Sequence, residues 1–443
     1  MNTHVLEVLG LKRPAGVHPP SSKLGAQTAI ERAPLPETVT LPLQQHIGAP
    51  AKVLVKTGDE VKVGQVIAEA GGFVSAPIHA TISGKVKQLP TVASSVTGKA
   101  VPGVVIESDG QDEWIELSPA DPDKLSPSEI VSRIKGAGIV GMGGATFPSH
   151  VKLSPPPEKT INTVIVNGAE CEPYITADNR LMIEHPERVL SGLAIVMKAL
   201  SVKRAFVAIE DNKPQAIAKM REQVSQMKFP GDVNVHVVPR RYPMGAEKTL
   251  INTILGKQVP EGGLPMDVGA LVHNVATLAA IHDAIVLGKP LVERVISVTG
   301  LVKTPKNFLA RFGTPASALI DLCGGSDSNA DELIFGGPMM GIAQPSFETA
   351  IIKGTNCILV KKSDLREEHD CIRCGRCVET CPMGLLPLQF VNLVKHEDYD
   401  HLINYHINNC VECGSCAYGC PANIPLVAYI KVGKLELRKL GVK

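Results

Sequence analysis

Long uninterrupted apolar runs are absent from this 443-residue sequence. The two longest apolar stretches are residues 190–200, which contain Lys198, and residues 269–287, which contain His273 and Asp283. A membrane-spanning helix needs about 20 mainly apolar residues, so neither stretch predicts one. The start of the chain also lacks the basic residues and apolar core of a signal peptide, so we expect none.

A charge excess of either sign is absent too. The chain has 45 Lys and Arg against 44 Asp and Glu, a net charge of +1, and only 4% aromatic residues. Nucleic-acid-binding surfaces usually combine a basic stripe with aromatic side chains, so we expect no nucleic-acid partner. The length exceeds the roughly 250–300 residues that one hydrophobic core supports, which predicts several domains.

Cysteine is present in an ordered pattern. Eight of the 11 cysteines form two copies of C-x2-C-x2-C-x3-C-P. This pattern resembles the run by which bacterial ferredoxins hold two [4Fe-4S] clusters, where the fourth cysteine of each copy binds the cluster of the other copy. The resemblance implies one cluster on Cys371, Cys374, Cys377 and Cys420, and a second on Cys410, Cys413, Cys416 and Cys381.

Zinc sites and disulfides explain the pattern less well. Structural zinc is usually held by two separated pairs of ligands, which leaves the third cysteine of each triplet without a role. Disulfide frameworks are typical of small secreted chains, whereas iron–sulfur thiolates suit a reducing compartment such as the cytoplasm. Cys171, Cys323 and Cys357 lie outside the pattern, and we expect them to be small buried hydrophobic residues.

The N-terminal part has an all-β pattern. Residues 41–89 alternate short β-rich runs with glycine-containing turns. Residues 53–86 resemble the biotinyl and lipoyl barrel-sandwich domains, whose hairpin tip carries a lysine for the prosthetic group. The matching tip here, residues 70–73 (AGGF), has no lysine. We therefore predict a docking or spacing module within residues 1–116.

The middle of the chain alternates strands and helices. We expect strands at residues 161–167, 204–210 and 233–239, and helices at residues 128–136, 186–200 and 214–227, the first capped by Ser126 or Ser128. Such alternation predicts a Rossmann-like unit with a largely parallel sheet that binds ligands at the carboxyl ends of its strands.

The fold class expected from these patterns is multidomain α/β. A β-grasp unit should follow the Rossmann-like unit, since residues 295–299 are strand-like and residues 316–322 helical. An α-helical ferredoxin-like domain with both cysteine motifs should end the chain. The predicted domains after the barrel-sandwich are residues 126–290, 291–362 and 363–443.

Two loops of the Rossmann-like unit have residues suited to ligands. Residues 141–148 (GMGGATFP) are rich in glycine, which lets backbone N–H groups approach a phosphate closely. Residues 167–174 (NGAECEPY) place two carboxylates and an amide after a strand. A tight turn between helices and a set of solvated loop charges are the alternative interpretations of these two loops.

Four segments together resemble the NADH-binding flavoprotein subunit of respiratory complex I. They are residues 141–148, 167–173, 242–248 and 273–278, and the expected β-grasp unit fits the same family. With a barrel-sandwich before them and the two cysteine motifs after them, nearly the whole chain resembles the C subunits of the Rnf ion-translocating electron transport complexes.

The resemblance implies a noncovalent FMN and NAD(H) as substrate, with no catalytic residue beyond the cofactors. FMN would be bound by Gly141, Gly143, Gly144, Lys152, Asn167, Glu170, Gly245, Asn274 and Thr277. NADH would be bound by Phe147, which would stack on adenine, and by Glu172 and Glu247. Departures from the complex I pattern occur at Met142, Ala169, Ala246 and His273.

The resemblance also implies a place and a task. The chain would be a peripheral subunit on the cytoplasmic face of the cell membrane, exchanging electrons between NAD(H) and ferredoxin through FMN and two [4Fe-4S] clusters. Other Rnf subunits would be its partners, ferredoxin would be an indirect one, and membrane subunits would move Na+ or H+. The alternatives are a soluble NADH-dependent reductase, of the cobalamin reductase or hydrogenase diaphorase type, and a ferredoxin-type relay that binds no nucleotide.

Overall fold

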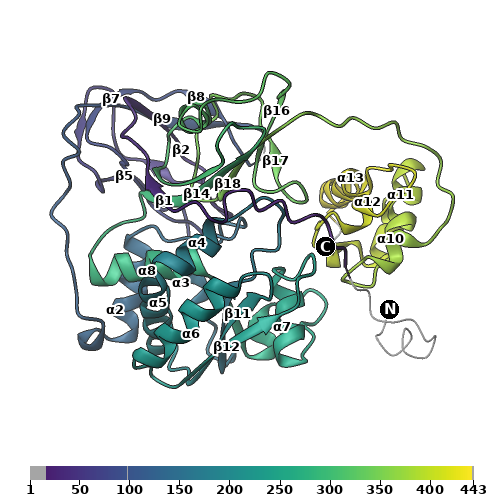
Figure 1. The fold of residues 1–443 in the computed structure, drawn as a ribbon, viewed down its shortest axis with the longest axis horizontal. Helices are drawn as coiled ribbons and strands as arrows, with labels where there is room; N and C mark the ends of the chain where they lie inside the picture. The colour runs from purple at the N-terminus through teal and green to yellow at the C-terminus, as the bar shows by residue number, and fades with distance from the viewer. Residues whose placement is uncertain (1–15, 97, 442–443) are drawn as a thin grey trace.

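The computed structural model describes residues 16–96 and 98–441, so residues 1–15 of the predicted first domain lie outside it. Two small sheets form the N-terminal β unit (Figure 1). One has the order β2-β9-β7-β4, with β8 paired to β9, and the other has the order β3-β5-β6. Their strands are β2 (Thr38–Pro42), β3 (Lys52–Val53), β4 (Glu60–Val61), β5 (Val66–Glu69), β6 (Ile78–His79), β7 (Gly84–Gln88), β8 (Thr91–Ala93) and β9 (Ala100–Ser108).

A four-stranded sheet with the order β12-β11-β10-β13 forms the centre of the Rossmann-like unit. All its neighbouring strands are parallel, which confirms the prediction. The strands are β10 (Thr163–Gly168), β11 (Arg204–Glu210), β12 (Asp232–Val238) and β13 (Ala270–Asn274). Because β10 lies between β11 and β13, its carboxyl end opens at the middle of the sheet edge where α/β proteins bind ligands.

Helices cover both faces of this sheet. The larger core packs α2, α5 and α8 against inward side chains such as Val164 and Val207, and the smaller core packs α7 against Ile165 and Ala208. Ser126 caps α2 through a capping box with Glu129. The helices are α2 (Pro127–Gly136), α3 (Ser149–Lys152), α4 (Ala177–Glu184), α5 (Pro186–Ala199), α6 (Pro214–Gln226), α7 (Glu247–Leu255) and α8 (Val275–Val286).

The third unit is a six-stranded mixed sheet with the order β1-β15-β14-β18-β16-β17. Its strands are β14 (Glu293–Gly300), β15 (Lys306–Arg311), β16 (Glu332–Phe335), β17 (Ile342–Ala343), β18 (Cys357–Lys361) and β1 (Ile30–Arg32), and α9 (Ala316–Asp321) packs on it. Strand β1 comes from the range predicted for the barrel-sandwich, but it pairs in parallel with β15, Ile30 lying opposite Asn307. The segment before Thr38 therefore contributes to the third unit.

The cysteine motifs lie in a small helical lobe at the side of the molecule (Figure 1). Its elements are α10 (Arg376–Glu379), α11 (Pro387–Lys395), α12 (Ser415–Tyr418), α13 (Leu426–Lys439) and the 3-10 helices Asp400–Tyr405 and Ile407–Asn409. Two further 3-10 helices, Pro122–Lys124 and Pro265–Val268, lie outside the lobe. Apolar side chains such as Phe390 and Ile430 form its core between α11 and α13. Among the described residues, no helix combines the length and apolar character required to cross a bilayer.

Candidate functional site

The glycine-rich loop connects α2 to α3 and closes on itself. The Gly141 N–H donates to the Phe147 carbonyl at 2.8 Å, and the Thr146 N–H donates back to the Gly141 carbonyl at 3.1 Å. Gly144 has a φ of +113°, a conformation that residues with a Cβ rarely adopt. Residues 143–145 at the tip are exposed, so the loop presents its backbone to the space above the sheet edge.

The first turn of helix α8, which directly follows β13, holds the glycine-rich loop in place. The Met142 N–H donates to Thr277 Oγ1 at 2.8 Å, and the buried Arg294 donates to the Met142 carbonyl at 3.0 Å. Asn274, the last residue of β13, caps α8 with its side chain and lies against Gly143. The structure thus brings together five expected flavin residues, Gly141, Gly143, Gly144, Asn274 and Thr277. Met142, a departure from the complex I pattern, contributes its backbone to these contacts, and its side chain is buried in the larger core.

Asn167, near the end of β10, and Glu170, in the loop that follows, lie beside them. Asn167 Nδ2 donates to the Gly245 carbonyl at 2.8 Å, which joins two more expected flavin residues. Glu170 Oε1 accepts a hydrogen bond from the Asp178 N–H at 2.7 Å, and Asp178 Oδ2 accepts one from Asn274 Nδ2 at 2.6 Å. Asp178 therefore links the two strand ends.

Buried carboxyls dominate the electrostatics of this edge. Burial raises the pKa of Glu170 to about 7, against the opposing effect of the Lys23 ammonium 3.9 Å away. Burial also raises the pKa of Asp178, against Arg294. A buried carboxyl is stabilised in its neutral form unless a cation lies close, so the two basic side chains decide how much negative charge this edge carries.

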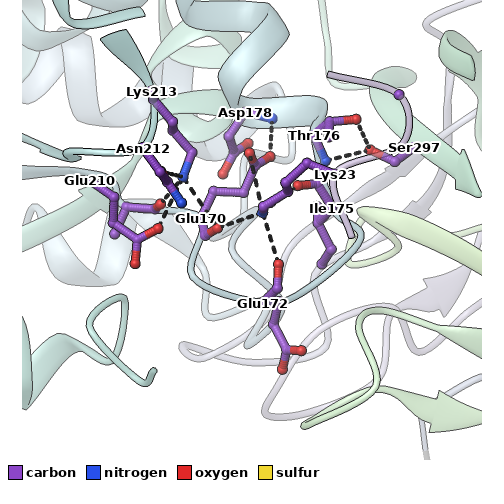
Figure 2. A network of polar contacts seen from close by, with 12 residues as sticks. Lys23, Glu170, Glu172, Ile175, Thr176, Asp178, Glu210, Asn212, Lys213 and Ser297 are labelled. Atoms are coloured by element: carbon purple, nitrogen blue, oxygen red, sulfur yellow. Dashed lines mark hydrogen bonds and ion pairs between the residues drawn. The ribbon is translucent and has the colours of Figure 1, made fainter. Parts of the chain in front are cut away.

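Two lysines and the loop after β10 form a polar network, which Figure 2 shows. Lys23 Nζ donates to the carbonyls of Glu170, Glu172 and Ile175 at 2.9, 2.9 and 2.6 Å. From the other side, Lys213 Nζ donates to the Ala169 carbonyl at 2.6 Å and pairs with Glu210 at 3.1 Å. These contacts fix the loop conformation, in which Glu170 has a φ of +47°.

The side chains expected to contact NADH already have partners within the protein. Glu172 accepts hydrogen bonds from the N–H groups of Met339 and Met340, at 3.2 and 2.9 Å, and its Oε1 lies 3.4 Å from the Tyr242 hydroxyl. Burial raises the pKa of Glu172 to about 7. Glu247 instead pairs with Lys152 at 2.8 Å. Phe147 is half-buried beside the glycine loop.

The eight motif cysteines surround two separate cavities in the helical lobe. One cavity is lined by Cys371, Cys374, Cys377 and Cys420, and we call these residues the outer cage. The other is lined by Cys381, Cys410, Cys413 and Cys416, which we call the inner cage. Each cage contains one cysteine from the other motif, and these groups of four are the ligand sets that the ferredoxin resemblance implies.

The donor chemistry of the cages fits iron–sulfur clusters. Four soft sulfur donors surround an otherwise largely apolar cavity in each, the environment that such clusters use. Burial raises the pKa of the Cys381 thiol to about 11, so cluster insertion must displace protons. Within residues 16–96 and 98–441, no three His, Cys, Asp or Glu side chains are grouped as a site for a single metal ion.

Four family models match the chain, in an order that agrees with this architecture. They are the RnfC barrel sandwich hybrid domain at residues 11–111, the Nuo51 FMN-binding domain at 134–283, the SLBB domain at 295–343 and the 4Fe-4S dicluster domain at 370–424. The matches confirm the predicted fold class and the expected FMN and [4Fe-4S] binding units.

Full-length relatives decide the family. The C subunit of the proton-translocating ferredoxin:NAD(+) oxidoreductase complex of Clostridium ljungdahlii is 49% identical, with 96% of this chain and 94% of the relative covered. The chain belongs to the family of Rnf C subunits. The C subunit of the ion-translocating oxidoreductase complex of Rhodobacter capsulatus is 44% identical, with 98% of this Rnf chain and 84% of the relative covered.

One more relative and one solved structure are similar to this Rnf chain. The C subunit of the Na(+)-translocating ferredoxin:NAD(+) oxidoreductase complex of Acetobacterium woodii is 40% identical over 95% of this chain and 96% of the relative. A solved NAD+-reducing [NiFe]-hydrogenase chain shares the fold at a TM-score of 0.50 and 16% identity, covering 73% of this chain and 69% of that one.

Sequence reasoning did not find several residues that organise the site. Lys23, Asp178 and Arg294 contact candidate flavin residues or their loops, yet none lies in a motif. Tyr242 lies in the segment 242–248, but its hydroxyl contact with the Cys413 carbonyl at 2.6 Å has no sequence signal. Only the short spacing of Asp178 from the loop after β10 could have suggested a role.

Proposed function

We propose that this chain is the electron-transferring subunit of an Rnf-type complex, exchanging electrons between NAD(H) and ferredoxin through FMN and two [4Fe-4S] clusters. The observation that carries the proposal is that one chain contains both an FMN-binding unit and a lobe with two cysteine cages. A relative from the family aligns with nearly the whole of this chain. A flavin accepts two electrons as hydride and releases them singly, which matches the one-electron capacity of each cluster.

The protein's own contribution is to hold and orient these groups. The glycine loop at residues 141–144 would contact the FMN phosphate and ribityl chain, with Asn167, Asn274 and Thr277 fixing the neighbouring strand ends. Lys152, which lies near the end of β13, would face the ring and is held by the Val272 carbonyl at 3.2 Å. The eight cysteines would supply both cluster ligand sets.

Glu172 and Glu247 remain our candidates for nucleotide contacts. Both would have to exchange a partner within the protein for the ligand, because Glu172 is bonded to the Met339–Met340 backbone and Glu247 to Lys152. Phe147, beside the glycine loop, would offer its ring to the adenine. Nucleotide binding would therefore be accompanied by a local rearrangement at the β16–β17 turn.

The names of the relatives support a place in a membrane complex that translocates H+ or Na+. We infer a peripheral position on the cytoplasmic face, with the other Rnf subunits as partners and ferredoxin as an indirect one. NADH would meet this chain directly.

Anaerobic purification with flavin and metal analysis tests the proposal. We expect one noncovalent FMN and about eight irons per chain, flavin bleaching by NADH, and recovery with the membrane fraction when the neighbouring subunits are expressed. Protein loaded with both clusters but unable to bind FMN or react with NADH would favour a simple relay. Full NADH reactivity without membrane association would favour a soluble reductase.

A further inference from the structure

The two cages differ in their exposure to solvent. Cys371 and Cys374 of the outer cage are exposed. In the inner cage, Cys381, Cys413 and Cys416 are only 6–7% exposed. The lobe therefore presents one cage to solvent and keeps the other inside, although the two motifs are identical in spacing.

The inner cage also touches the flavin-binding unit, through Tyr242. This side chain is 2% exposed, and its hydroxyl donates to the Cys413 carbonyl at 2.6 Å. Tyr242, Cys413 and Val17 form one buried cluster, with Met339 packed against it. Gly414 approaches the Met339 backbone so closely that a Cβ would lie 2.8 Å from the Met339 carbonyl oxygen. The contact is thus a packed interface.

Tyr242 is continuous with the candidate cofactor residues on its other side. It precedes Gly245, whose carbonyl accepts from Asn167, by three residues. Its hydroxyl lies 3.4 Å from Glu172 Oε1. The backbone of Tyr242 is fixed as well, since its N–H and carbonyl pair with Val17 at 2.9 and 2.8 Å. One side chain therefore contacts both a candidate nucleotide residue and a cage backbone.

We propose that Tyr242 is a positioning residue that docks the inner cage onto the flavin-binding unit, so that the cluster of the inner cage is the one that exchanges electrons with the flavin. This inference rests on the proposed function. In the direction from NADH, the flavin would accept a hydride, release its proton to solvent and pass the two electrons singly to the inner cluster, which would hand on the first electron before it accepts the second. The exposed outer cage then exchanges electrons with a partner.

The hydroxyl should also affect the redox potential of the inner cluster. Its hydrogen points at the carbonyl of a ligating cysteine, so the positive end of the O–H dipole faces the cage. Reduction adds negative charge to a cluster, and a nearby positive dipole stabilises the reduced form. Lys434, which donates to the Cys410 carbonyl at 2.7 Å, acts in the same direction.

The experiment compares Tyr242→Phe with the wild type in the full chain, purified anaerobically with flavin and iron. Phenylalanine fills the same space, so only the hydroxyl is lost. Mediator-poised titrations followed by electron paramagnetic resonance should show one of the two cluster signals at a lower midpoint potential and the other unmoved. Relative to the rate at which NADH bleaches the flavin in the same variant, reduction of the shifted cluster should be severalfold slower than in the wild type.

Three further variants identify the signals and control for mutation. Lys434→Met should lower the same signal as Tyr242→Phe, and Cys374→Ser should alter the other signal, because it removes an outer-cage ligand. Tyr429→Phe is the matched control. Its hydroxyl lies 3.2 Å from Glu368 in the same lobe, so both midpoints should stay at the wild-type values.

Unchanged midpoints and unchanged cluster reduction in Tyr242→Phe would overturn the inference, as would a shift confined to the signal that Cys374→Ser alters. Failure of the proposed function has a different result. NADH would then not bleach a flavin in the wild-type protein, while the mediator titration would still report the effect of Tyr242 on the inner cluster.

Discussion

At the scale of residues, three buried carboxyl groups lie among the candidate cofactor residues. Glu170, Glu172 and Asp178 lie near the carboxyl end of the central strand β10, and burial raises the pKa of each. Each is held by backbone N–H groups or by a neighbouring amide, which costs less than burial with no partner. These partners therefore offset part of the desolvation free energy that burial of the three carboxyls costs.

Glu172 should make the free energy of unfolding depend on pH. Its pKa in the folded protein is about 7, above the ordinary value of 4.5, so the folded state binds more protons than the unfolded state between these values. The free energy of unfolding should fall as the pH rises through this window, by up to roughly 3 kcal/mol. Urea unfolding at a series of pH values between about 5 and 8 measures this fall in the free energy of unfolding.

The decline should be smaller in Glu172→Gln, where Glu170 and Asp178 still contribute to it, and should be retained in full in Glu348→Gln, which alters an exposed carboxyl of the third unit. Parallel pH profiles for the wild type and Glu172→Gln would show that Glu172 is already ionised in the folded protein. The raised pKa would then be wrong.

Cys381 tests the exchange of ligands between the two motifs. It belongs to the first motif but lines the cavity of the second triplet. Cys381→Ala should therefore lose about half of the iron and the same cluster signal that Cys416→Ala loses. Iron and sulfide analysis with electron paramagnetic resonance measures this, and Cys323→Ala, a buried thiol outside both cages, should keep the full iron content. Loss of the signal that depends on Cys374 would contradict the assignment of the cages.

At the scale of elements, the connection from α2 to α3 is the segment that we predict to bind the flavin. Its tip has a conformation that depends on Gly144, where φ is +113° and no heavy atom lies within 4 Å of the position that a Cβ would take. The space is open, so the barrier to substitution lies in the backbone and not in crowding. We therefore predict that the backbone conformation of Gly144 affects the affinity for FMN.

Gly144→Ala should weaken FMN binding by roughly tenfold, because an L-residue pays about 1–2 kcal/mol for a left-handed conformation. Fluorescence titration of the flavin-free protein with FMN gives the dissociation constant. The control is Gly256→Ala, which also has a positive φ, of 65°, and open space, but ends α7 away from the loop. Equal FMN affinity in Gly144→Ala and the wild type would exclude this loop from flavin binding.

Much of the element structure was predictable because it depends on local signals. The strand expected at residues 204–210 is β11 with the same bounds, and Ser126 caps α2 as one of the two serines considered. Alternating apolar residues and capping groups act over a few positions, so a sequence contains them directly. The cage compositions also agree with the expected ligand sets, which the resemblance to bacterial ferredoxins implied.

The polar contacts of the site were not predictable in this way. Lys23 reaches Glu170 across 147 positions of sequence, and Tyr242 reaches Cys413 across 171. No periodicity or spacing encodes such pairs, because they exist only after separate units have packed. The roles of Glu172 and Glu247 as nucleotide contacts remain predictions for the same reason, since their partners in the protein come from other elements.

At the scale of the whole molecule, the segment from Gly16 to Arg32 joins the units. It pairs with Tyr242 at Val17, places Lys23 under the loop after β10, and ends as β1 on the edge of the third unit's sheet. This one segment thus contacts the flavin-binding unit and the third unit, and Val17 packs with Cys413 of the lobe. We therefore expect substitutions in this short segment to lower the free energy of unfolding of the whole protein strongly.

Lys23→Met should destabilise the protein by about 3–5 kcal/mol, because it leaves Glu170 buried without its nearest cation and removes three donors from the loop. Thermal unfolding of the anaerobic protein measures the loss. Addition of Glu170→Gln should recover part of it, since the uncompensated charge is then gone. A double variant no more stable than Lys23→Met would assign the whole effect to the lost backbone contacts.

The parallel pairing of β1 with β15 has a consequence for synthesis on the ribosome. Ile30 leaves the exit tunnel early, but its neighbour in the sheet, Asn307, is translated only after the entire flavin-binding unit. Domains generally fold as they emerge, so the barrel-sandwich and the Rossmann-like unit can form while the leading segment still waits for its place. The polar composition of β1, Ile-Glu-Arg, suits a strand that must stay solvated during that delay.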